Sequence, residues 1–141
     1  TRSAVIVLSN TGAVPIGPLQ DTLVSLLIGE LHAPMAETPK INGAPPAEVA
    51  LALIHQLQTG SLVRSQLGED YSRYLQDAKL SAAAAGLSGL GEPSKIDVTG
   101  TYERGGMEVA GLTITFKTTT LTANLYRTPD GKIQQFLLYK E

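Results

Sequence analysis

The sequence contains no cysteine. This excludes disulfide bonds, thiolate metal sites and cysteine nucleophiles, and the chain fits a bacterial periplasm or cytoplasm equally well. Charge is also sparse, since charged residues make up 17% of the chain and the net charge is −2. Such a chain has no electrostatic attraction for nucleic acid or for an anionic membrane surface, so neither is expected as a partner.

Long hydrophobic runs and histidines are scarce too. The apolar run Ala4-Val5-Ile6-Val7-Leu8 is too short for the core of a signal peptide or for a membrane span. Because the first residue is not methionine, we expect a fragment or a processed product. The two histidines, His32 and His55, have no acidic residues at ligand spacing around them, so neither a metal nor a cofactor is expected.

Apolar and polar residues alternate in four short runs between Ile96 and Tyr139. Successive side chains of a strand point to opposite faces, so each run predicts a strand with one face against a core. Gly105-Gly106 permits the positive φ values of a tight hairpin, and residues 128–131, Thr-Pro-Asp-Gly, are typical of a turn. The prediction is a four-stranded antiparallel meander.

In two of these runs the apolar residues change from odd-numbered to even-numbered positions. The change falls across Ala110-Gly111 in the second run, and between Ile133 and Phe136 in the fourth. A flip of this kind is what a β-bulge produces, and bulges bend a sheet. We therefore expect a bulge in the second strand, another in the fourth, and a curved sheet.

Helical patterns precede the sheet. The first begins at Pro46 and ends near Gly60, and its expected apolar face is formed by Val49, Ala52, Leu53, Gln56 and Leu57. Three further segments read as helical: Leu62–Leu67, Glu69–Gln76, and a helix from Asp77 with Leu80, Ala83, Ala84 and Leu87 on one side. Helices followed by an antiparallel sheet predict an α+β fold, with the helices on one face of the sheet and a pocket in its concavity.

The first part of the chain reads as a separate piece. The run over residues 4–8 predicts a strand covered on both faces, and Leu19, Leu23, Leu26, Leu27 and Leu31 then repeat at helical spacing. Because one strand and one helix cannot close a core, residues 1–31 are expected to complete another domain. Residues 32–46 contain four prolines and predict a linker, and residues 47–141 are expected to form the α+β domain.

Two families resemble these pieces. Residues 47–140, which end in Asp130-Gly131-Lys132-Ile133-Gln134-Gln135-Phe136, resemble the nuclear transport factor 2-like (cystatin-like α+β) superfamily. Residues 1–31, with Thr-Arg-Ser-Ala-Val-Ile-Val-Leu-Ser-Asn before a leucine-rich helix, look like the last strand and helix of a serine β-lactamase-like hydrolase of the class C or esterase type. The second resemblance implies a periplasmic or secreted parent protein that hydrolyses an amide or ester.

The catalytic motifs of that hydrolase family are missing from this sequence. No serine is followed three positions later by lysine, and no Tyr-x-Asn occurs. Asn10-Thr11-Gly12 is interpreted as a turn rather than as the family's Thr-Gly element. We therefore expect no catalytic residue in this chain, and we expect any hydrolase machinery to lie upstream of Thr1.

Candidate pocket or interface residues remain. Enzymes of the nuclear transport factor 2-like type place an acid and a tyrosine inside the pocket, which the resemblance transfers to five residues: His55, Asp97, Tyr102, Glu108 and Tyr126. The alternation of Asp97, Glu103 and Glu108 with apolar residues equally favours a solvent-facing position.

The opposite face of the sheet gives a second set of candidates. Thr113, Thr115, Thr122, Asn124 and Tyr126, with Phe136 and Leu138 near the last strand, suit a face that meets a second copy of the chain or the hydrolase domain.

Two functions follow from these observations. The first is a non-catalytic accessory or interaction domain at the C-terminal end of a serine hydrolase. The alternative is a domain that binds a small ligand, or an isomerase, using the pocket between helices and sheet.

Overall fold

The computed structural model describes Ile6, residues 16–28 and residues 37–140. The chain divides into two compact units, Thr1–Met35 and Ala36–Glu141. In the first unit the structure describes one helix, α1 (Ile16–Ile28). The strand predicted over residues 4–8 lies outside the described residues, except for Ile6, whose side chain is exposed.

The second unit is α+β, as predicted. Its helices come first, namely α2 (Pro46–Thr59), the 3₁₀ turn η1 (Arg64–Gln66), α3 (Glu69–Tyr74), α4 (Asp77–Leu87) and the 3₁₀ turn η2 (Ser88–Leu90). Four strands follow: β1 (Lys95–Arg104), β2 (Met107–Thr115), β3 (Thr120–Arg127) and β4 (Ile133–Lys140). Each strand pairs antiparallel with the next in the order β1-β2-β3-β4, which is the predicted meander.

The turns between the strands use the residues that the sequence indicated. Gly105 and Gly106 both have positive φ, at 61° and 80°, as a two-residue hairpin requires. In the turn between β3 and β4, the Thr128 hydroxyl and the Lys132 amide both donate to the Asp130 carboxylate, and Gly131 takes a φ of 84°. These bonds hold the pKa of the Asp130 carboxyl below its usual value, chiefly through the Thr128 hydroxyl.

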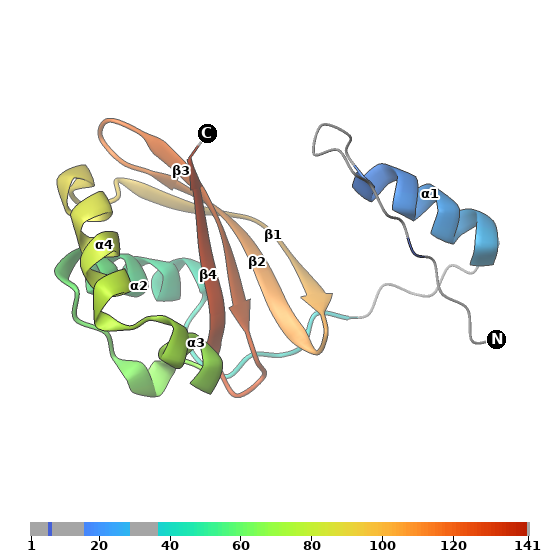
Figure 1. The fold of residues 1–141 in the computed structure, drawn as a ribbon, viewed down its shortest axis with the longest axis horizontal. Helices are drawn as coiled ribbons and strands as arrows, with labels where there is room; N and C mark the ends of the chain where they lie inside the picture. Colours follow the sequence, from blue (N-terminus) through green and yellow to red (C-terminus); the bar gives the residue numbers. More distant parts are fainter. Residues whose placement is uncertain (1–5, 7–15, 29–36, 141) are drawn as a thin grey trace. The chain divides into compact units, whose positions relative to one another are not determined.

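Helices α2, α3 and α4 gather on one side of the sheet (Figure 1). The core lies between these two layers, and its strand residues are Ala110, Leu112, Ile114, Leu121, Ala123, Leu125, Ile133 and Phe136. From α2 it receives Ala50, Leu53, Ile54 and Leu57, so the buried face is rotated from the predicted one: Ala52 is exposed. Gly60 ends α2 in the left-handed conformation as predicted, whereas the helix predicted over residues 62–67 is only the turn η1.

One of the two predicted bulges is confirmed. The pairing of β4 with β3 shifts by one residue between Tyr126 and Arg127 of β3. Gln134 therefore has no residue opposite it on β3, and Ile133 and Phe136 lie on the same face. The bulge predicted in β2 was wrong, because β2 and β3 pair without interruption. The extra residue is Thr99 of β1, which lies opposite Gly111 of β2 at the level of the apolar flip.

The flip in β2 has another cause. Val109 lies on the face of the sheet away from the helices, where it pairs with Tyr102 on one side and Tyr126 on the other. These two neighbours explain why Val109 is fully buried although no helix covers that face.

Candidate binding groove beside strand β4

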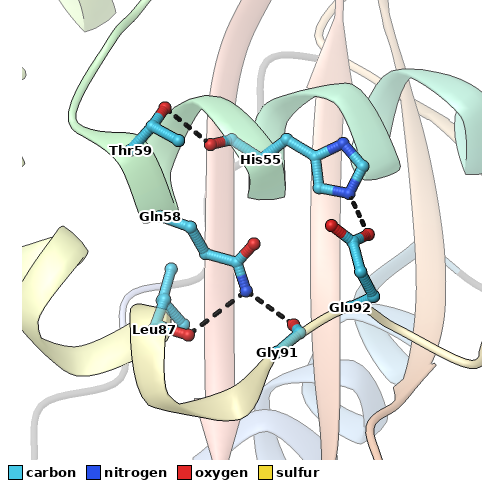
Figure 2. Close-up of polar contacts among 6 residues, drawn as sticks. All are labelled: His55, Gln58, Thr59, Leu87, Gly91 and Glu92. Atoms are coloured by element: carbon cyan, nitrogen blue, oxygen red, sulfur yellow. Dashed lines mark hydrogen bonds and ion pairs between the residues drawn. The ribbon is translucent and has the colours of Figure 1, made fainter.

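His55 lies on α2, outside any described cavity. Its Nε2 atom is 2.5 Å from Oε2 of Glu92, in the segment before β1, and both side chains are substantially exposed (Figure 2). Nearby, Gln58 donates to the carbonyl oxygens of Leu87 and Gly91. These contacts tie α2 to the end of α4 and to the start of the sheet, so they have a structural role.

The other predicted pocket or interface residues lie on the face of the sheet away from the helices, here called the open sheet face. Asp97 pairs with Thr113 and Tyr102 with Val109 in the register of β1, and Thr115 and Tyr126 lie on the same face. Asp97 forms an ion pair with Lys95 at 2.9 Å. The structure therefore places these four side chains on one face of the sheet, apart from His55.

Phe136 and Leu138 do not belong to the open sheet face. They pair with Leu125 and Ala123, which point toward the helices. The bulge at Gln134 fixes this parity, and it places Leu137 and Tyr139 of β4 on the open sheet face instead.

Glu108 is neither exposed nor in a pocket. It pairs with Arg127 in the register of β2 and β3, on the helix side of the sheet. Nε and Nη2 of Arg127 donate to Oε2 of Glu108 at 2.9 and 2.5 Å, and Nη1 donates to the carbonyl oxygen of Ala44 at 2.7 Å. The residue Arg127 is only 2% exposed, so this is a buried ion pair that satisfies both charges.

A groove of about 770 Å³ runs along β4. One wall is β4 itself over residues 134–139, and the other comes from α3 and α4. The helix residues that line it are Leu57, Asp70, Tyr71, Tyr74, Leu75, Ala83, Gly86 and Leu87. None of the five pocket candidates taken from the sequence lines this groove, but Phe136 and Leu138 of the interface set do.

The position of α3 relative to β4 is set by three contacts. The Gly68 amide donates to the Ile133 carbonyl oxygen at 2.8 Å, and Leu67 forms a parallel bridge with Ile133. One turn later the Tyr71 hydroxyl donates to the carbonyl oxygen of Phe136 at 3.3 Å. Further along β4 no such contact holds a helix against the strand within the described part of the chain, and the groove opens there.

The groove is poor in charge. Asp70 is its one charged lining residue among those described, and it forms an ion pair with Arg73 at 3.1 Å. The ring of Tyr74 stacks on that of Tyr71 and carries the Lys79 ammonium 3.1 Å from its centroid. Apart from Asp70, Gln134 and Gln135, the lining is formed by aliphatic and aromatic residues and Gly86, a surface that suits an uncharged, mainly apolar ligand.

Sequence reasoning missed this groove, although part of its signal was visible. Ala83 and Leu87 lie with Leu80 on the side of α4 that the spacing predicted, and both pack against the core. Gly86 also lines the groove but was not part of that prediction. The small size of Ala83 and Gly86 prevents the helix from filling the space beside β4. Nothing lies within 4 Å of the position that a Cβ on Gly86 would occupy.

Burial raises the pKa of Tyr71 to about 12 from 10.0. The folded state holds this proton more tightly than the unfolded state, so its contribution to stability is complete below pH 10 and is lost as the pH rises toward 12. We expect the free energy of unfolding to fall by about 2–3 kcal/mol more in the wild type than in Tyr71→Phe across this range. Urea unfolding of both proteins at several pH values measures the difference, and parallel pH profiles would contradict it.

Residues 16–28 and 37–140 contain neither a cluster of metal ligands nor a helix that could span a membrane. No group of three or more His, Asp or Glu residues in the described part of the chain could hold a metal ion. No described helix is both long and apolar enough to cross a membrane.

The second unit is thus an α+β domain with an apolar groove between its helices and the last strand of its sheet. Comparison with protein families, with curated proteins and with solved structures found no match for this chain.

Proposed function

We propose that this chain is the C-terminal portion of a serine β-lactamase-like hydrolase, and that residues 37–140 are its non-catalytic accessory domain, which binds an apolar partner in the groove beside β4. The observation that carries the binding role is the groove itself, a charge-poor cavity of about 770 Å³. Its size falls in the range of ligand sites, and the one carboxylate among its described lining residues is already paired with Arg73.

Helix α1 supports the link to a larger domain. Leu19, Leu23 and Leu26 follow one another at spacings of four and three residues, so they share one side of the helix. Their side chains are 48%, 38% and 75% exposed. A leucine stripe of this kind normally lies against a core, which the proposed hydrolase domain would supply.

The hydrolase assignment makes a direct prediction. The coding sequence upstream of Thr1 is expected to contain Ser-x-x-Lys and Tyr-x-Asn, and the 141-residue chain alone is expected to hydrolyse nitrocefin and p-nitrophenyl esters no faster than buffer does. Absence of both upstream motifs would refute the assignment. Turnover by the chain itself would refute the non-catalytic role.

A small apolar ligand in the groove is the alternative function, and the cavity volume favours it as well. Steroids, short acyl chains and aromatic acids are then expected to raise the melting temperature, because a ligand that binds only the folded state stabilises it. If no compound in such a screen moves the melting temperature, the alternative is refuted.

The open sheet face is proposed to meet a second copy of the chain. Around its centre lie Thr113, Thr122, Asn124 and Tyr139, which carry no charge, so two copies of this patch would meet without charge repulsion. Thr122→Lys is expected to weaken the dimer, because it would bury an unpaired charge there, whereas Ser81→Lys on the exposed side of α4 should not. Light scattering measures the mass, and a monomeric wild type at high concentration would refute the dimer.

A further inference from the structure

The sheet of the second unit has two edges, and they differ in kind. The edge strand β1 carries the bulge at Thr99 and the charged residues Lys95, Asp97, Glu103 and Arg104. Bulges and charges of this sort prevent another strand from pairing with an edge. Between its bulge at Gln134 and the terminal Lys140, strand β4 has neither, because residues 135–139 read Gln-Phe-Leu-Leu-Tyr.

The hydrogen-bonding groups of β4 that point outward can be identified. The Phe136 carbonyl oxygen accepts from Tyr71 on α3, so the backbone groups of Phe136 point away from β3. These directions alternate along an antiparallel strand, so the groups of Leu138 and the amide of Lys140 also point outward. No described backbone group outside the sheet bonds to the amides of Phe136 or Leu138, or to the Leu138 carbonyl.

Phe136 and Leu138 line the groove, and Lys140 follows directly after its β4 wall. Residues 134–139 form its β4 wall, which at about 3.3 Å per residue extends for about 17 Å. A strand that paired with this edge would place alternate side chains in the groove, against Leu75, Ala83 and Leu87. Backbone amides beside apolar walls are costly to leave unpaired, and a peptide backbone satisfies them.

A second copy of β4 does not fit this place. Two copies of β4 pair antiparallel only about a two-fold axis normal to the sheet, which puts the helices of both copies on the same face. Helices α3 and α4 already extend beyond the edge of β4 to form the outer wall of the groove, so they would collide with those of the partner. A lone extended segment avoids this collision.

We propose that the groove accepts an extended segment of another polypeptide as a fifth strand paired with β4, with uncharged apolar side chains at every second position. This deepens the binding role proposed for the same groove and rests on it. The apolar positions face the helices, where a charge would be buried without a partner. The backbone bonds to Phe136, Leu138 and Lys140 supply affinity, and the apolar wall supplies selectivity.

Three labelled peptides test the pairing. The parent has the blocked sequence Thr-Val-Thr-Ile-Thr-Val-Thr, and two isomers carry three N-methyl groups each, either on the valine and isoleucine amides or on the amides of the last three threonines. Only one of these two sets of amides faces β4 in a paired strand, because amide directions alternate along it. Fluorescence anisotropy with the 141-residue chain should show one isomer binding like the parent and the other at least about tenfold more weakly.

Two matched variants locate the binding. Gly86→Leu is expected to occupy part of the groove, since Gly86 lines it and nothing lies within 4 Å of its Cβ position, and leucine also favours the helix. Gly89→Leu has the same free space, but Gly89 does not line the groove. Gly86→Leu is expected to weaken the parent peptide at least about tenfold and Gly89→Leu to leave it unchanged, with thermal unfolding confirming that both fold.

Several results of these binding experiments would contradict the proposal. Equal binding of the two methylated isomers, or unchanged binding to Gly86→Leu, would overturn pairing with β4. Binding of decanoate without binding of any peptide would overturn it too, while leaving the groove as a site for a small apolar ligand. If neither decanoate nor the parent peptide binds, both the fifth strand and the proposed binding role of the groove are overturned.

Discussion

Arg127→Met is expected to lower the free energy of unfolding by about 3–5 kcal/mol, because it leaves the Glu108 carboxylate buried without its partner. The arginine donates to Glu108 through two nitrogens and to the Ala44 carbonyl oxygen through a third. Its removal therefore strands a charge and an acceptor together in the interior. Urea unfolding of the variant and the wild type at neutral pH measures the difference.

A surface pair serves as the control. Arg73 forms ion pairs with Glu69 and Asp70 on α3, but its side chain is 66% exposed and theirs are 85% and 93% exposed. Arg73→Ala should therefore cost less than about 1 kcal/mol. The double variant Glu108→Leu with Arg127→Met should recover much of the loss, because apolar residues replace a buried pair at little cost. If Arg127→Met costs no more than Arg73→Ala, the pair does not stabilise the fold.

Much of the sheet could be predicted from the sequence because its signals are local. Alternation with a period of two located all four strands, and Gly105-Gly106 and Gly131 marked turns that need positive φ. The bulge at Gln134 was visible for the same reason: Ile133 and Phe136 lie three positions apart and are both buried. In each case the residues that carry the signal are close together in the chain.

The errors in the sheet arise where burial comes from a neighbouring strand. Val109 reads as a core residue of the helix side, but its burial comes from Tyr102 and Tyr126 on the open sheet face. Glu108 has the spacing of an exposed residue, and it is buried because its charge is compensated by the ion pair with Arg127 of β3. Neither pairing can be read from one strand alone, since register decides which side chains meet.

The candidate site was missed for a related reason. Composition and spacing put Tyr71, Ala83 and Leu87 on apolar helix faces, but they do not say how far a face lies from the sheet. That distance depends on the position of α3 along β4, and the hydrogen bonds of Gly68 and Tyr71 to β4 set this position. The His55–Glu92 contact spans 37 positions of sequence and was equally invisible.

Gly131→Ala is expected to lower the free energy of unfolding by about 2–4 kcal/mol, for two separate reasons. An alanine at position 131 would have to adopt a φ of 84°, a backbone conformation that residues with a Cβ disfavour. It would also overlap the backbone carbonyl oxygen of Asn42, whose amide donates to the Pro129 carbonyl oxygen at 2.9 Å. Backbone atoms cannot rotate away as a side chain can, so this contact between residue 42 and the turn would be lost. Thermal and urea unfolding measure the change.

Gly106→Ala separates the two causes. Gly106 has nearly the same φ, 80°, but nothing lies within 4 Å of its Cβ position, so this variant should lose only about 1–2 kcal/mol. The excess loss of stability in Gly131→Ala then measures how much the contact between Asn42 and the turn stabilises the fold. Equal losses in the two variants would show that the contact between Asn42 and the turn contributes nothing to the fold. An excess would place Asn42 inside the folded domain, so that a chain cut at residue 47 loses a contact that stabilises the turn between β3 and β4.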